Sequence, residues 1–145
     1  MPGQTQTGAE MSKETMMHAR PLSPHLQIYR LIPTMLMSIL HRITGGALYF
    51  GTLLLAWWVI AAATSQHTFD IANLAFGSWI GRLVLFGYTW ALVHHLLGGI
   101  RHLIWDTGNW MEKRTATRLA WATIIGSVAL TIIIWIVGYA ARGAF

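Results

Sequence analysis

The sequence contains no cysteine and few charged residues. Without cysteine, none of its 145 residues can form a disulfide or supply a thiolate to zinc or to an iron–sulfur cluster. Metal ligands would have to be histidine or carboxylate side chains. Charged residues make up only 10% of the chain and hydrophobic residues 54%, whereas a soluble domain carries roughly 25% charged residues. The composition therefore predicts a membrane protein.

Acidic residues are especially scarce, with five Asp and Glu against ten Lys and Arg, and the net charge is +5. Such an excess of positive charge is also typical of nucleic-acid-binding proteins. Here, however, the basic residues lie at the edges of apolar segments and do not gather on one polar face. We therefore expect a lipid bilayer as a partner and no nucleic acid.

The first residues of the chain are polar. Residues 1–20 contain no apolar run of the kind that a secretory signal needs. Glu10 and Glu14 also argue against a transit peptide, because transit peptides are poor in acidic residues. We expect residues 1–19 to form a mostly disordered tail and residues 20–145 to form one transmembrane domain.

Three apolar segments are long enough to cross a bilayer as helices, at about residues 33–64, 78–105 and 116–139. Pro33 suits the first position of a helix. The first helix would be about 48 Å long, so its first two turns are expected to lie outside the hydrocarbon core of roughly 30 Å. Residues 65–77 are expected to be a connecting loop, and 110–118 a short basic loop. The sequence predicts an all-α membrane protein with three transmembrane helices.

The basic residues also predict an orientation. Eight of the ten lie before the first span, at its start or around the second connection, and only Arg82 and Arg142 fall on the other side. The positive-inside rule then places the N-terminus and the second connection in the cytoplasm (or the matrix) and the C-terminus outside. The polar ends of the first and second spans consequently lie at the same inner edge, where they can meet.

The second span carries His95, Gly98, Gly99 and His102 at the helical spacing i, i+3, i+4 and i+7, which is one face. The two glycines leave a flat patch that a bulky planar group could approach. Intramembrane histidines usually face a bundle interior or a cofactor, so the pattern predicts a haem pocket. The alternative is a pair of core histidines beside a helix-packing glycine pair.

A haem iron held by two imidazoles needs one histidine on each side of the ring. His95 and His102 lie on one helix face, about 10.5 Å apart along its axis, and cannot bind one iron together. The third span contains no histidine, so the second ligand is expected from another chain in a hetero-oligomeric bundle. We predict His95 as the ligand, because His94 lies off the glycine face and is expected only to pack or hydrogen-bond.

The first span presents a similar face, formed by Ser38, His41, Arg42 and Gly45. The Ser38 hydroxyl and the Arg42 guanidinium lie one turn apart and could hydrogen-bond a quinone carbonyl. The guanidinium would also stabilise negative charge developing on the quinone oxygen. The alternative is an interfacial arginine bound to lipid phosphate.

Two histidines and two arginines at the rim of the predicted haem pocket are candidates to pair with haem propionates. These are His41 and His102, helped by Arg42 and Arg101. Asp106 follows in the same region, where it could handle protons, pair with one of the arginines or simply end the helix.

Three ordered motifs resemble the cytochrome b membrane-anchor family of succinate dehydrogenase. Residues 20–29, RPLSPHLQIY, are similar to the N-terminal signature of that family. Residues 38–45, SILHRITG, are similar to its S-x-x-H-R-x-S/T-G signature. Residues 95–106, HLLGGIRHLIWD, are similar to its H-x-x-x-G-x-R-H-x-x-x-D signature. The similarity extends from about residue 20 to the C-terminus.

The resemblance implies a role for each matching residue. His95 would be an axial ligand of haem b, opposite a histidine of a second, companion membrane anchor. Ser38 and Arg42 would belong to the ubiquinone site, and His41 would lie near the haem propionates. A flavoprotein subunit would oxidise succinate and an iron–sulfur subunit would pass the electrons on. This chain would contribute no succinate chemistry of its own.

We expect the chain to lie in the bacterial inner membrane, where the C-terminus that the basic residues place outside would be periplasmic. Two alternatives remain open. One is the haem-bearing anchor of a fumarate reductase, in which menaquinol is oxidised instead. The other is a small membrane transporter or assembly protein, which would carry no haem and no flavoprotein partner.

Overall fold

The computed structural model describes residues 8, 24, 28 and 30–143. The chain divides into two units, Met1–Arg30 and Leu31–Phe145, and the second of these contains the helical fold. The predicted tail over residues 1–19 and the first signature motif fall almost entirely outside the described residues.

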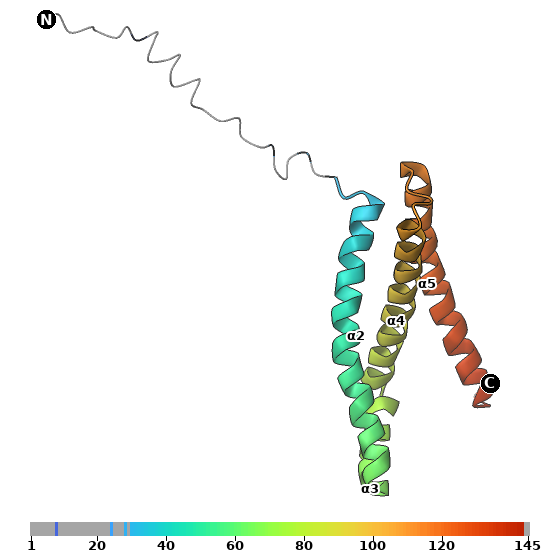
Figure 1. Cartoon of the computed structure of the whole chain (residues 1–145). Coiled ribbons are helices and arrows are strands. Elements are labelled where there is room, and N and C mark those ends of the chain that lie inside the picture. Colours follow the sequence, from blue (N-terminus) through green and yellow to red (C-terminus); the bar gives the residue numbers. More distant parts are fainter. Residues whose placement is uncertain (1–7, 9–23, 25–27, 29, 144–145) are drawn as a thin grey trace, which may run out of the picture. The chain divides into compact units, whose positions relative to one another are not determined.

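The second unit is built from four helices, α2 (Pro33–Thr64), α3 (Gln66–Gly77), α4 (Trp79–Asp106) and α5 (Lys113–Ala141) (Figure 1). Three of them, α2, α4 and α5, are long and apolar enough to cross a membrane. With 32, 28 and 29 residues, each exceeds the roughly 30 Å hydrocarbon core. The all-α fold with three spans is confirmed. Helix α5 begins at Lys113, three residues before the predicted boundary at 116. The prediction of a loop over residues 110–118 was therefore wrong for most of its length, because the segment from Lys113 onward is the first part of α5.

The prediction of a loop over residues 65–77 was wrong, because this segment contains the twelve-residue helix α3. Ser65 caps its first turn, since the Ser65 hydroxyl oxygen accepts a hydrogen bond from the Thr68 amide at 3.2 Å. The Thr68 hydroxyl donates back to the Ala61 carbonyl of α2 at 2.9 Å. A single residue therefore separates α2 from α3 and turns the chain back.

Helix α4 packs against α2 on one side and α5 on the other (Figure 1). Small and hydroxyl-bearing side chains fill these contacts, which is how membrane helices approach one another closely. The Thr123 and Thr131 hydroxyls donate to the carbonyls of Leu119 and Ser127, four residues earlier, at 2.8 and 2.7 Å. Both hydroxyls are thus satisfied within their own helix.

Most large apolar side chains of this unit face outward. The buried apolar core of the described residues consists of six side chains, four of them alanine: Met37, Ala61, Ala72, Ala91, Val93 and Ala120. Leu53, Ile60 and Ile125 are each more than half exposed. An apolar exterior of this extent is stable only against lipid or other subunits.

Candidate functional site

The predicted faces of the first and second spans meet where α2 and α4 pack. The imidazole rings of His41 and His95 stack with their centroids 3.9 Å apart and their planes inclined by 8°. The ring of His102 lies 5.4 Å from that of His41. The structure therefore brings together three histidines that the sequence placed on two separate helices.

Each stacked ring lies over a glycine of the opposite helix. A methyl group added to Gly98 would lie 2.6 Å from His41 Nδ1, and one added to Gly45 would lie 3.3 Å from His95 Cε1. The first distance is too short for any side chain, and the second is tight. The glycines are thus required so that the backbones can approach and leave room for the two imidazoles.

The hydrogen bonds of Thr44 favour a proton on Nδ1 of His95. The Thr44 hydroxyl donates to the Leu40 carbonyl at 2.8 Å, and the same oxygen lies 3.4 Å from His95 Nδ1. Because the Thr44 proton is directed at Leu40, its lone pairs are free to accept from Nδ1–H. In that tautomer the free lone pair of His95 is on Nε2, the nitrogen through which it would bind a metal.

His94 belongs to a different contact. Its side chain is fully buried, and its Nδ1 lies 3.2 Å from the Ser127 hydroxyl of α5. His94 thus packs and hydrogen-bonds against a neighbouring helix, as predicted. The sequence did not indicate a contact between Ser127 and His94, because a serine within an apolar helix commonly bonds only to its own backbone. Ser127 makes such a bond too, since its hydroxyl donates to the Ile124 carbonyl at 2.9 Å.

Arg101 is a buried cation beside this cluster. Only 4% of its surface is exposed, and its guanidinium carbon lies 5.0 Å from the centre of the Trp105 ring. Within the described residues, Arg101 Nε and Nη1, Trp105 Nε1 and His41 Nδ1 are buried without a hydrogen-bond partner. Buried polar groups of this kind are costly and normally find a partner.

These unpartnered donors and the free Nε2 of His95 fit a haem. A haem offers an iron that an imidazole nitrogen can bind and two carboxylates that can accept from guanidinium and indole N–H groups. The side chains of this cluster therefore suit both the iron and the propionates of a haem.

The remaining predicted site residues lie at the same end of the bundle with exposed side chains: Ser38, Arg42, His102 and Asp106. Ser38 and Arg42 are one turn apart on α2, outside the stacked pair. Asp106 is the last residue of α4, in agreement with the helix-ending alternative.

The sequence matches the family of the succinate dehydrogenase/fumarate reductase transmembrane subunit over residues 16–134. It is 48% identical over 118 residues to the succinate dehydrogenase cytochrome b556 subunit of Paracoccus denitrificans, covering 81% of this chain and 91% of the relative. The corresponding subunit of Rickettsia felis is 36% identical over 125 residues, which is 86% of this chain and 98% of the relative.

A mitochondrial protein is also similar, the succinate dehydrogenase cytochrome b560 subunit of Sus scrofa, at 36% identity over 78% of this chain and 68% of the relative. The range matched by the family contains all three signature motifs and the histidine cluster. The chain therefore belongs to the family of succinate dehydrogenase/fumarate reductase transmembrane subunits.

Proposed function

We propose that this chain is the cytochrome b membrane anchor of a succinate dehydrogenase, respiratory complex II, that binds haem b with a second membrane subunit and forms part of a ubiquinone-reduction site. The anchor role in complex II follows from the family and from relatives named as succinate dehydrogenase cytochrome b subunits. These names favour succinate dehydrogenase over the fumarate reductase alternative. The single observation that carries the haem assignment is the stacked His41–His95 pair over Gly45 and Gly98.

His95 is the axial ligand in this proposal, through Nε2. His41 cannot be the ligand from the other side, because its ring lies face to face with that of His95 and both rings approach from the same interface. His102 lies on the same helix as His95. The second ligand is therefore assigned to a histidine of the companion membrane anchor. When bound, haem supplies a centre that accepts and donates single electrons.

The propionates are assigned to the rim residues His41, His102, Arg42 and Arg101. Support comes from Arg101 above all, since it is buried and two of its donor atoms are without a partner. A carboxylate accepting from this guanidinium would supply both the missing hydrogen bonds and the missing negative charge.

Ubiquinone is assigned to Ser38 and Arg42 at the N-terminal end of α2. Both side chains are exposed and therefore accessible from outside this unit. The hydroxyl and the guanidinium would donate to a quinone carbonyl, and the guanidinium would stabilise negative charge as the oxygen is reduced. Asp106, exposed at the end of α4, is the candidate to deliver protons from the adjoining water.

A flavoprotein subunit would oxidise succinate and pass the electrons to an iron–sulfur subunit. The iron–sulfur subunit would then deliver them to the quinone. We assign the chain to a bacterial inner membrane with the N-terminus cytoplasmic and the C-terminus periplasmic. The distribution of basic residues supports this orientation, because among the basic residues within 30–143 only Arg82 and Arg142 lie at the end opposite the histidine cluster.

Purification of the tagged chain from its native membrane in mild detergent tests the proposal. We expect a flavoprotein and an iron–sulfur subunit to co-purify, together with succinate oxidation and a haem band in the reduced-minus-oxidised spectrum. A colourless preparation without flavin would contradict it.

A further inference from the structure

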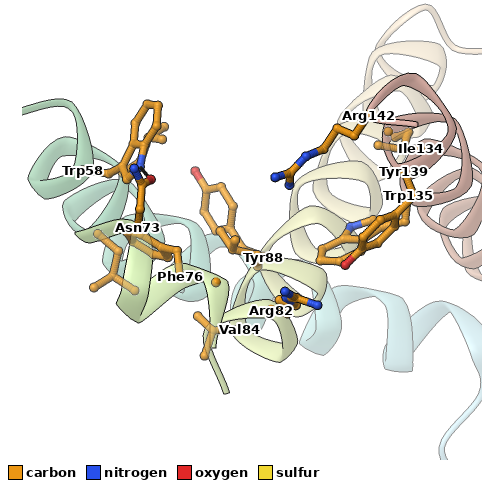
Figure 2. Close-up of a pocket in the computed structure, with 16 residues that line it drawn as sticks. Trp58, Asn73, Phe76, Arg82, Val84, Tyr88, Ile134, Trp135, Tyr139 and Arg142 are labelled. Atoms are coloured by element: carbon orange, nitrogen blue, oxygen red, sulfur yellow. Dashed lines mark hydrogen bonds between the residues drawn. The ribbon is translucent and has the colours of Figure 1, made fainter. Parts of the chain in front are cut away.

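A second feature of the bundle lies away from the histidine cluster. A cavity of about 810 Å³ opens between α2, α3, α4 and α5 (Figure 2). On α2 its wall includes Leu54, which is thirteen residues beyond His41 and hence about 20 Å further along the helix axis. The cavity therefore belongs to the other end of the bundle and is separate from the proposed haem and quinone positions.

The wall of this cavity is mainly apolar and aromatic. The polar atoms of its indole rings are already satisfied, since Trp58 Nε1 donates to Asn73 Oδ1 at 3.0 Å and Trp135 Nε1 donates to Thr89 Oγ1 at 3.2 Å. In Figure 2, Trp58 and Asn73 lie together on one side of the cavity and Trp135 lies on the other. What the wall presents to an occupant is therefore hydrocarbon and aromatic surface, which suits an apolar chain.

Two arginines line the same cavity, Arg82 near the start of α4 and Arg142 directly after α5. Figure 2 shows the Arg142 side chain extending toward Tyr88. None of the acidic residues within 30–143, which are Asp70, Asp106 and Glu112, lines the cavity. The site thus combines an apolar wall with two positive charges that no carboxylate of the wall neutralises.

We propose that this cavity binds an anionic phospholipid, with its phosphate between Arg82 and Arg142 and its acyl chains along the apolar wall. Guanidinium groups recognise phosphate oxygens through paired, charge-assisted hydrogen bonds. A purely apolar transmembrane helix of another subunit would cover the apolar wall but leave both cations without a counter-charge. A quinone would fit the wall, but it carries no net charge to balance two guanidiniums.

The test measures phospholipid bound to the purified complex. We expect the double variant Arg82→Gln/Arg142→Gln to lose about one tightly bound anionic phospholipid per copy of this chain, counted by extraction and mass spectrometry. The control is Arg118→Gln, an exposed arginine of α5 outside the cavity, which should retain that lipid. Phosphatidylglycerol added in mixed detergent micelles should raise the melting temperature of the delipidated wild-type complex but not that of the double variant. Phosphatidylcholine added in the same way should raise neither.

A second variant fills the apolar part and leaves both arginines in place. Gly138 lines the cavity, and a Cβ atom there would meet nothing within 4 Å. The side chain of Gly138→Phe should therefore occupy part of the cavity and displace the lipid. Gly87→Phe is the matched control, because its Cβ is also unhindered but lies outside the cavity. Equal phospholipid content in all variants would overturn the proposal. A photo-crosslinking residue in place of Leu55, which lines the cavity, would also overturn it if it reacted with another subunit or with quinone.

Discussion

The environment of His95 is defined by three groups that belong to other residues. The Thr44 hydroxyl fixes the side of the ring that carries the proton, the ring of His41 fixes its plane, and Gly45 leaves the space it occupies. The helical spacing predicted the face on which His95 lies. It could not predict the stacking, since side-chain rotamers at a helix–helix contact depend on the partner helix.

Gly98→Ala should disturb this pair, because the added methyl would lie 2.6 Å from His41 Nδ1. We expect a cost of about 1–3 kcal/mol in stability and a lower haem content per complex, measured by thermal unfolding and pyridine haemochrome assay. Gly99→Ala is the control, since its methyl would meet nothing within 4 Å. If both variants had the melting temperature and the haem content of the wild type, the close approach of His41 to Gly98 would have no role in stability or in haem binding.

Arg42→Ala should separate two activities of the complex. Succinate oxidation with a soluble dye should persist, because the flavoprotein is untouched. Ubiquinone reduction should fall by about 100-fold, which is typical when a donor to a developing negative charge is removed. Arg118→Ala, also an exposed arginine, should preserve both rates. A parallel loss of both activities in Arg42→Ala would refute the quinone role.

At the scale of the helices, the contact of His94 with Ser127 is a buried polar link between α4 and α5. Ser127 is completely buried and His94 is 1% exposed. Because His94 directly precedes His95, this hydrogen bond fixes the position of α4 relative to α5 beside the histidine cluster. Nothing in the spacing of residues indicates this pairing, because the two positions are 33 residues apart.

Ser127→Ala should leave the His94 imidazole without its partner. We expect the complex to lose about 1–3 kcal/mol of stability, the cost of an unsatisfied buried polar group, seen as a lower melting temperature. Thr64→Ala serves as the comparison, because that exposed hydroxyl bonds only to the Ile60 carbonyl of its own helix. An equal melting temperature in the two variants would mean that the His94–Ser127 contact carries no stability.

The three spans were predictable because long apolar runs are the strongest signal that a sequence carries. Helix α3 was not, because it is short and begins with the polar residues Gln66, His67 and Thr68. Its stability comes from the Ser65 cap and from the bond of Thr68 to α2, and such tertiary support has no periodic pattern.

For the whole molecule, the decisive property is that the bundle is incomplete. Its core is mostly alanine, its large apolar side chains face outward, and its proposed metal ligand has no second histidine placed across from it within the described residues. The lipid-sized cavity at the other end was also beyond prediction, since residues of four separate helices form it. Both features require other molecules of the membrane to complete them.

The most direct test of the central claim is the reduced-minus-oxidised absorption spectrum of the intact complex carrying His95→Ala. Loss or a marked shift of the haem bands is the expected result, because removing one axial imidazole changes the coordination of the iron. His67→Ala, an exposed histidine of α3 outside the cluster, should leave the bands unchanged. A wild-type spectrum from His95→Ala would contradict the assignment of His95 as a haem ligand.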